Sequence, residues 1–215
     1  MGHKKGFYEK YIKRPLDFWC AFIALIVLAP VLLVTALLVR IKLGSPGNFT
    51  QERPGLNEKI FKLYKFRSMT DEKDERGNLL PDEKRLTSFG QKLRATSLDE
   101  LPELINILKG DLAICGPRPL AVQYLPFYTP EERIRHTVRP GLSGRAQVNG
   151  RNDLQWEERF AFDIEYVKNI TFRGDVHIIL QTIYKAIRRE NIVVRGTGKT
   201  IDFDQYRKNQ IKGEE

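Results

Sequence analysis

The chain has 215 residues, a length that favours a single domain large enough to bury a core. Its net charge of +9 indicates partners that carry phosphate, such as a nucleotide, an anionic lipid or a nucleic acid. The two distant cysteines, Cys20 and Cys115, and three scattered histidines match no metal-ligand spacing, which argues against a zinc site and a disulfide framework. A reducing cytoplasmic environment fits this cysteine usage best.

The first distinctive segment is apolar, since residues 18–39 carry no charge. At about 1.5 Å per residue, a helix of this length just crosses about 30 Å of hydrocarbon. Pro30 interrupts the segment near its middle and removes a backbone donor. Basic residues flank both ends: Lys10, Lys13, Arg14, Arg40 and Lys42. Because basic flanks prefer the cytoplasmic side, the residues support a helix that bends at Ala29-Pro30 and re-enters the same face as well as they support a kinked span.

A β region and a charged loop are expected next. Pro54 and Gly55 mark a turn, and residues 60–66 are rich in the aromatic and β-branched types that strands favour. Residues 70–85 carry ten charges in sixteen positions, which predicts a solvated loop.

A helix is predicted where apolar residues recur at helical spacing: Leu98, Leu101, Leu104, Ile105 and Leu108. Pro102 suits its first turn, Gly110 is a plausible C-terminal stop, and Ser97 or Asp99 is the expected N-cap. Ser97 and Glu100 also match a capping box.

Two loops and a second helix complete the pattern. Residues 114–120 and 139–151 are rich in glycine, proline and arginine, a composition that suits phosphate binding but also suits plain connections. An apolar stripe at Val176, Ile179, Leu180, Ile183 and Ile187 predicts an amphipathic helix. This helix could lie on an anionic membrane surface or pack on the core.

The adjacent acids Asp99 and Glu100 have two interpretations. Acidic residues at a helix start gain about 0.3–1 kcal/mol each from the helix dipole, which is reason enough for their presence. However, arginines and lysines from several turn-rich segments could form a phosphate pocket around them. Carboxylates in such a pocket hold a divalent cation or attack phosphorus.

Several sequence blocks together resemble the bacterial sugar transferase family of monotopic phosphoglycosyl transferases: "YKFRSM", "SLDELPELINILKGDLAICGPRP" and "RPGLSGRAQVNGR". The likeness runs from about residue 11 to residue 189, and it is greatest to short members that use UDP-N,N′-diacetylbacillosamine in bacterial N-linked glycosylation. Where family members commonly carry Ser-Pro at the membrane bend, this chain has Ala29-Pro30.

The resemblance implies a fold and a location. The fold is α+β and mainly helical, with an N-terminal re-entrant membrane helix, a small β-hairpin and amphipathic interfacial helices around a cytoplasmic catalytic core. The expected units are residues 1–43 for the basic segment and re-entrant helix, 44–190 for the catalytic domain and 191–215 for a polar C-terminal tail. The expected location is the inner leaflet of the bacterial cytoplasmic membrane.

The resemblance also implies a reaction. Family members transfer a sugar 1-phosphate from a UDP-sugar to undecaprenyl phosphate and release UMP, with Mg²⁺ as cofactor. Asp99 and Glu100 match the catalytic dyad, in which the Asp forms a covalent phosphosugar intermediate and is implicated in metal binding. The residues expected to bind the substrate phosphates are Lys65, Arg94, Arg118 and Arg151.

Two other functions have some support in the sequence. The positive charge and aromatic residues permit a membrane-tethered nucleic-acid-binding protein, but the cations are spread among separate loops, so no nucleic-acid partner is expected. The triplet at residues 202–204 has the DxD form of an ordinary metal-dependent glycosyltransferase, which would release UDP.

Overall fold

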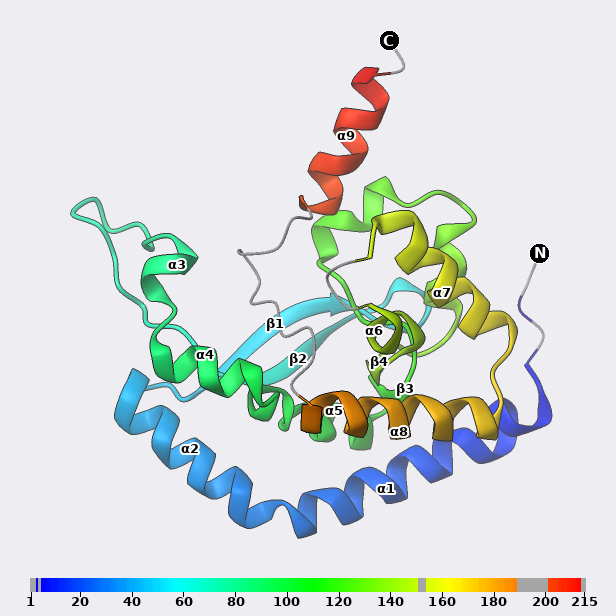
Figure 1. The fold of residues 1–215 in the computed structure, drawn as a ribbon, viewed down its shortest axis with the longest axis horizontal. Coiled ribbons are helices and arrows are strands. Elements are labelled where there is room, and N and C mark those ends of the chain that lie inside the picture. Colours follow the sequence, from blue (N-terminus) through cyan, green and yellow to red (C-terminus); the bar gives the residue numbers. More distant parts are fainter. Residues whose placement is uncertain (1–2, 4, 151–153, 189–200, 214–215) are drawn as a thin grey trace.

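The computed structural model describes residues 3, 5–150, 154–188 and 201–213. It confirms a mainly helical α+β fold with small sheets (Figure 1). The helices are α1 (Lys13–Val27), α2 (Ala29–Leu43), α3 (Asp82–Arg85), α4 (Ser88–Ala95), α5 (Glu103–Lys109), α6 (Arg145–Asn149), α7 (Trp156–Lys168), α8 (Phe172–Arg188) and α9 (Phe203–Gly213). The strands are β1 (Asn48–Pro54), β2 (Ile60–Phe66), β3 (Ala113–Cys115) and β4 (Gly141–Ser143).

The apolar segment forms α1 and α2, which meet in a shallow V below the rest of the molecule (Figure 1). Within the described ranges, no single helix has the length and apolar content to cross a membrane. The pair Tyr8–Val27 and Ala29–Leu43 meets both criteria together and is bent by 65°. The break falls at Leu28, and Pro30 lies in the first turn of α2, where a missing N–H leaves no helix bond unmade.

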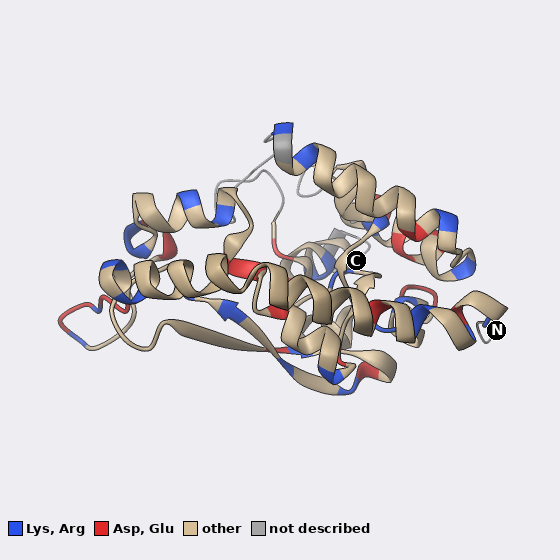
Figure 2. Ribbon diagram, turned by 90° about the horizontal axis from the view of Figure 1, so that it is seen from below, with Lys and Arg blue, Asp and Glu red and all other residues tan. Residues whose placement is uncertain are grey.

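Both arms of the V are attached to the globular part. Ala21 of α1 packs with Leu104 and Ile107 of α5 in one buried cluster. Val39 of α2, fully buried, packs with Phe66 of β2 in another. The basic residues of the pair lie at its two outer ends (Figure 2).

Basic side chains at the start of α1 bind the globular part directly. Lys13 Nζ lies 2.6 Å from a carboxylate oxygen of Asp175 in α8. The guanidinium of Arg14 donates to the carbonyls of Ile107 and Leu108 at 2.6 and 2.9 Å, and so caps the C-terminal end of α5. The helix that follows the dyad is therefore joined to α1 by packing and by hydrogen bonds.

Two small sheets form the β part. Strands β1 and β2 make an antiparallel hairpin in which Lys65 pairs with Phe49, and the strand predicted at residues 60–66 is confirmed. Strands β3 and β4 form a parallel pair, which lies above α8 in the view of Figure 1.

The apolar stripe of α8 was expected either to pack on the core or to lie at a surface, and its residues divide between a buried and an exposed face. Ile178 is buried in the core, with Ile179 packed against the same cluster. Leu180 and Ile183 are more than half exposed. One face of α8 thus packs inward, and the other presents apolar side chains at the surface.

The segment predicted as a polar tail contains a packed helix, α9. Phe203 at its start is fully buried among the rings of Tyr124, Tyr128, Trp156 and Phe160. This one aromatic residue explains the docking of an otherwise polar segment, because a buried aromatic ring contributes much more apolar area than its polar neighbours.

Candidate active site

The dyad lies in a short 3₁₀ turn, η3 (Leu98–Glu100), directly before α5. The predicted N-cap at Ser97 or Asp99 is wrong, because Pro102 is the residue that precedes α5. Ser97 has a left-handed backbone, with φ 54°, and makes no capping hydrogen bond, whereas a capping residue normally has an extended backbone. The helix begins later than expected, at Glu103 after Pro102, and it ends as predicted at Gly110.

Glu100 is paired with two cations from other segments. Its Oε1 lies 2.5 Å from Nη2 of Arg118, in the loop after β3, and 2.8 Å from Nζ of Lys65, in β2. Burial raises the pKa of Glu100, but the charges and hydrogen bonds of Arg118 and Lys65 outweigh burial and hold the pKa below its usual range. Glu100 is therefore an anion that fixes both cations beside Asp99.

Asp99 is buried, with 8% of its surface exposed, yet no hydrogen bond or ion pair joins its carboxylate to another described residue. Burial, and then the charge of Glu100, raise the pKa of Asp99 to about 6, against the opposing charges of Lys65, Arg94 and Arg118. At neutral pH the group is mostly ionised and unpaired. Such a carboxylate can act as a nucleophile or as a ligand.

The other two cations predicted to bind the substrate phosphates are Arg94 and Arg151. Arg94 lies in α4, where its Nε donates to Oγ of Ser68 at 2.9 Å, and its charge lowers the pKa of Asp99. The structure therefore brings Arg94, Lys65 and Arg118 to the dyad. Arg151 lies outside the described residues.

A third carboxylate, Glu103, lies at the site and was not predicted from the sequence. It is 2% exposed, and its Oε1 lies 3.2 Å from Nζ of Lys65, so Lys65 sits between Glu100 and Glu103. Burial, together with the charge of Glu100, raises the pKa of Glu103 to about 7. Its position three residues after Glu100 was the available signal, because residues at that spacing share a helix face.

Asn106, one turn further along the same face, holds β2 against α5. Its side chain is fully buried, accepts from the backbone N–H of Tyr64 at 3.0 Å and donates to the carbonyl of Lys62 at 2.8 Å. The amide thus takes the place of a neighbouring strand at the edge of β2. This contact sets the position of Lys65 relative to the dyad.

Asp99 is the residue expected from the resemblance to bind Mg²⁺. Across the described part of the chain, no three side chains of His, Cys, Asp and Glu gather as a metal cluster. Mg²⁺ is usually held by one or two carboxylates, with waters and substrate phosphates as its other ligands. The unpaired carboxylate of Asp99 fits that description.

The DxD triplet belongs to the packing of α9. The hydroxyl of Tyr124 donates to Asp202 at 2.9 Å, and Phe203 between the two aspartates is buried. These contacts assign the triplet a structural role.

An unpaired buried carboxylate beside cations held by a second carboxylate is an arrangement that suits chemistry on phosphate groups. The chain belongs to the bacterial sugar transferase family, whose family model matches residues 8–189.

Relatives support the assignment. The chain is 50% identical over 181 residues to the uncharacterized sugar transferase EpsL of Bacillus subtilis, which covers 84% of this chain and 90% of EpsL. It is 37% identical over 187 residues to the UDP-glucose:undecaprenyl-phosphate glucose-1-phosphate transferase of Escherichia coli, over 82% of this chain and 40% of that protein. It is 34% identical over 199 residues to the undecaprenyl-phosphate galactose phosphotransferase of Salmonella typhimurium, over 85% of this chain and 42% of that protein. The chain thus spans about two fifths of the last two relatives.

Proposed function

We propose that this protein transfers a sugar 1-phosphate from a UDP-sugar to undecaprenyl phosphate and releases UMP, as a membrane step of glycoconjugate assembly. The observation that carries the proposal is the buried carboxylate of Asp99, which has no hydrogen bond or ion pair to another described residue and lies beside Arg118 and Lys65. The names of the Escherichia coli and Salmonella relatives describe reactions of this kind.

The reaction proceeds in two displacements at one phosphorus. A carboxylate oxygen of Asp99 attacks the β-phosphorus of the UDP-sugar, the bond from that phosphorus to the bridging oxygen breaks, and UMP leaves with the electron pair. The sugar phosphate is then an acyl phosphate on Asp99. An oxygen of undecaprenyl phosphate attacks the same phosphorus, the bond to Asp99 breaks, and the carboxylate is restored.

The cations make the attack of one anion on another possible. A carboxylate and a diphosphate repel each other, so positive charge is needed where charge develops in the transition state. Arg118 offers a planar fork and Lys65 a point charge. Mg²⁺, held by Asp99, would supply further neutralisation of the diphosphate. Glu100 keeps both cations in place when the substrate is absent.

The membrane arrangement belongs to the same proposal. Apolar side chains are exposed along the bent pair and on one face of α8, including Trp19, Ile26, Leu33, Leu180 and Ile183. Burying such a surface in the lipid of the inner leaflet would hold the dyad near the headgroups. The pair α1–α2 would then be re-entrant, and the globular part cytoplasmic.

The sugar is a separate question. UDP-N,N′-diacetylbacillosamine stays a prediction from the resemblance, since the names of the Escherichia coli and Salmonella relatives specify glucose and galactose. A panel of UDP-sugars assayed for UMP release with undecaprenyl phosphate identifies the donor. Release of UDP would support an ordinary glycosyltransferase, and salt-dependent binding of oligonucleotides would support the nucleic-acid alternative.

The covalent step has its own test. Purified enzyme, Mg²⁺ and the UDP-sugar, without lipid acceptor, should release about one equivalent of UMP per enzyme, because a two-step mechanism completes its first half alone. Intact mass spectrometry should show a phosphosugar adduct that Asp99→Asn lacks. UMP release only when undecaprenyl phosphate is present, with no adduct, would favour direct transfer.

A further inference from the structure

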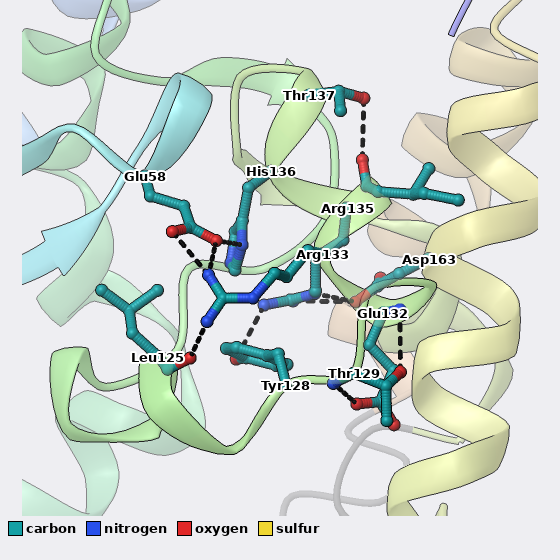
Figure 3. Close-up of polar contacts among 11 residues, drawn as sticks. Glu58, Leu125, Tyr128, Thr129, Glu132, Arg133, Arg135, His136, Thr137 and Asp163 are labelled. Carbon is teal, nitrogen blue, oxygen red and sulfur yellow. Dashed lines mark hydrogen bonds and ion pairs between the residues drawn. The ribbon is translucent and has the colours of Figure 1, made fainter. Parts of the chain in front are cut away.

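Arg135 is fully buried, and all three nitrogens of its guanidinium donate hydrogen bonds. Nε and Nη2 donate to one carboxylate oxygen of Asp163 in α7 at 3.0 and 2.8 Å, and Nη1 donates to the hydroxyl of Tyr128 at 3.2 Å (Figure 3). Nη2 also donates to the backbone carbonyl of Arg118 at 2.7 Å. The guanidinium lies 5.6 Å from the ring centres of both Tyr128 and Phe160.

The contact with the carbonyl connects this core to the dyad. Arg118 extends its own guanidinium to Glu100, so its backbone is held by one buried arginine while its side chain meets the catalytic pair. A buried charge tolerates few arrangements, because each donor needs an acceptor. Arg135 therefore restricts the backbone of the Arg118 loop.

We infer that Arg135 is a positioning residue that sets the guanidinium of Arg118 at the substrate phosphates. The inference rests on the proposed function, because it takes Arg118 as a phosphate-binding group. A flexible lysine cannot serve these three acceptors at once, since it lacks the planar fork. Arg135→Lys keeps the charge beside Asp163 and loses the fixed position of the loop.

Arg133 supplies a matched control two residues away. It also joins a carboxylate to a backbone carbonyl, because Nη1 pairs with Glu58 and Nη2 donates to the carbonyl of Leu125 at 2.7 Å (Figure 3). Among the described residues, no hydrogen bond or ion pair joins Arg133 to the loop that carries Arg118. Val167→Ala adds a second control, since Val167 is fully buried in the core of α7 and removing its methyl groups lowers stability without touching Arg135.

The experiment measures the burst of UMP release without lipid acceptor, in which the amplitude reports the active fraction and the rate constant reports the chemistry. For Arg135→Lys we expect a rate constant lower by about tenfold to a hundredfold at an unchanged amplitude, the loss that small misplacement of a catalytic group causes. Arg133→Lys should stay within about threefold of the wild type. Val167→Ala should lower the melting temperature at least as much as Arg135→Lys and keep the wild-type rate constant.

A second measurement tests whether Arg135 acts through Arg118. In an Arg118→Ala background no guanidinium is left to place, so adding Arg135→Lys should change the rate constant by less than about twofold. Losses that multiply, equal losses for Arg133→Lys and Arg135→Lys, or a loss confined to the amplitude would each overturn the inference. If Arg135→Lys fails to fold, Tyr128→Phe removes one acceptor, keeps the ring and is judged by the same criteria. Absence of UMP release by the wild type would reject the proposed function instead.

Discussion

Asp99 carries a charge where its surroundings disfavour one. Burial and the charge of Glu100 raise its pKa from the ordinary range to about 6, and no described residue pairs with it. A group with a raised pKa in the folded state stabilises the fold only below its unfolded pKa, and that contribution is lost as the pH rises through the folded value. At neutral pH, therefore, the ionised carboxylate of Asp99 lowers the stability of the fold.

The Asp99→Asn variant separates these two effects. We expect UMP release to fall to background and the free energy of unfolding at pH 7.5 to rise, on the order of 1–3 kcal/mol, because a shift of one pKa unit corresponds to about 1.4 kcal/mol. The gain should shrink towards pH 4, where Asp99 is protonated in the folded wild type. Thermal unfolding of both proteins at the two pH values measures the difference. Activity in a folded Asp99→Asn variant would remove Asp99 from the mechanism.

The same pKa predicts a limit on activity at low pH. The nucleophile must be ionised, so kcat/KM for the UDP-sugar should fall tenfold per pH unit below about 6. The pH profile of the free enzyme, at constant ionic strength, measures this limb. Glu100 should not contribute a limb in this range, because Arg118 and Lys65 hold its pKa low. A profile flat down to pH 5 would contradict the assigned role of Asp99.

The sequence alone predicts some residues of the site and not others. The cations Lys65, Arg94 and Arg118 were predicted because they lie in recognisable blocks, and the structure brings them to the dyad. Glu103 and Arg135 were missed because burial creates their roles. No local pattern says that Glu103 is 2% exposed beside Lys65, or that Arg135 faces a carbonyl seventeen positions away in the chain.

At the scale of elements, β2 is held against the dyad and α5 by hydrogen bonds and ion pairs. Glu100, Glu103 and Asn106 recur every three residues, so they face β2 together. The two carboxylates hold the side chain of Lys65, and Asn106 holds the backbone beside it. The hairpin is thereby held at the dyad through both a side chain and the backbone of β2.

Asn106→Leu tests this attachment. The leucine leaves the N–H of Tyr64 and the carbonyl of Lys62 without partners, which should lower the free energy of unfolding by about 1–3 kcal/mol and displace Lys65 from Glu100. We expect UMP release to fall more than tenfold. Ile107→Ala, at the adjacent fully buried position, should cost about 2–5 kcal/mol. It should leave the rate per folded molecule nearly unchanged, since the apolar side chain of Ile107 packs with Leu63 of β2 but satisfies no backbone group of that strand. Equal losses in the two variants would reduce Asn106 to a packing residue.

Element types were more predictable than their ends. The strand at residues 60–66 and the helix end at Gly110 followed from residue chemistry alone. The start of α5 did not, because Ser97 offered a capping signal that its left-handed backbone cannot use. Helix α9 was not foreseen, because its docking depends on Phe203 entering an aromatic cluster built from distant segments.

At the scale of the whole molecule, the bent pair is attached at both of its arms. Lys13 and Arg14 bind α8 and α5 at one end, and Val39 packs beside Phe66 of β2 at the other. If the apolar bend enters lipid, both arms must return to the face where the globular part lies. We therefore expect positions 5 and 45 to share the cytoplasmic face.

Cysteine labelling measures this topology. Lys5→Cys and Ser45→Cys, each in a background with Cys20 and Cys115 replaced, should resist a membrane-impermeant thiol reagent in intact cells and react once the membrane is opened. A cysteine in a known periplasmic protein serves as the positive control. Labelling of position 5 or 45 from outside would show a spanning helix.

Pro30→Leu tests what keeps the pair bent. The leucine supplies an N–H that can donate to the carbonyl of Ile26, so the substitution favours a straight helix over a bent one. Straightening must pull one arm from the globular part, and the ion pair of Lys13 with Asp175 opposes that movement. We expect Pro30→Leu to expose a minor fraction of one cysteine position to the outside and to lower the transfer of sugar 1-phosphate to the lipid. Adding Asp175→Asn to Pro30→Leu should enlarge the exposed fraction. If the double variant stays entirely protected and fully active, neither the proline nor this ion pair sets the bend, and the packing of α1 on α5 and of α2 on β2 is sufficient to maintain it.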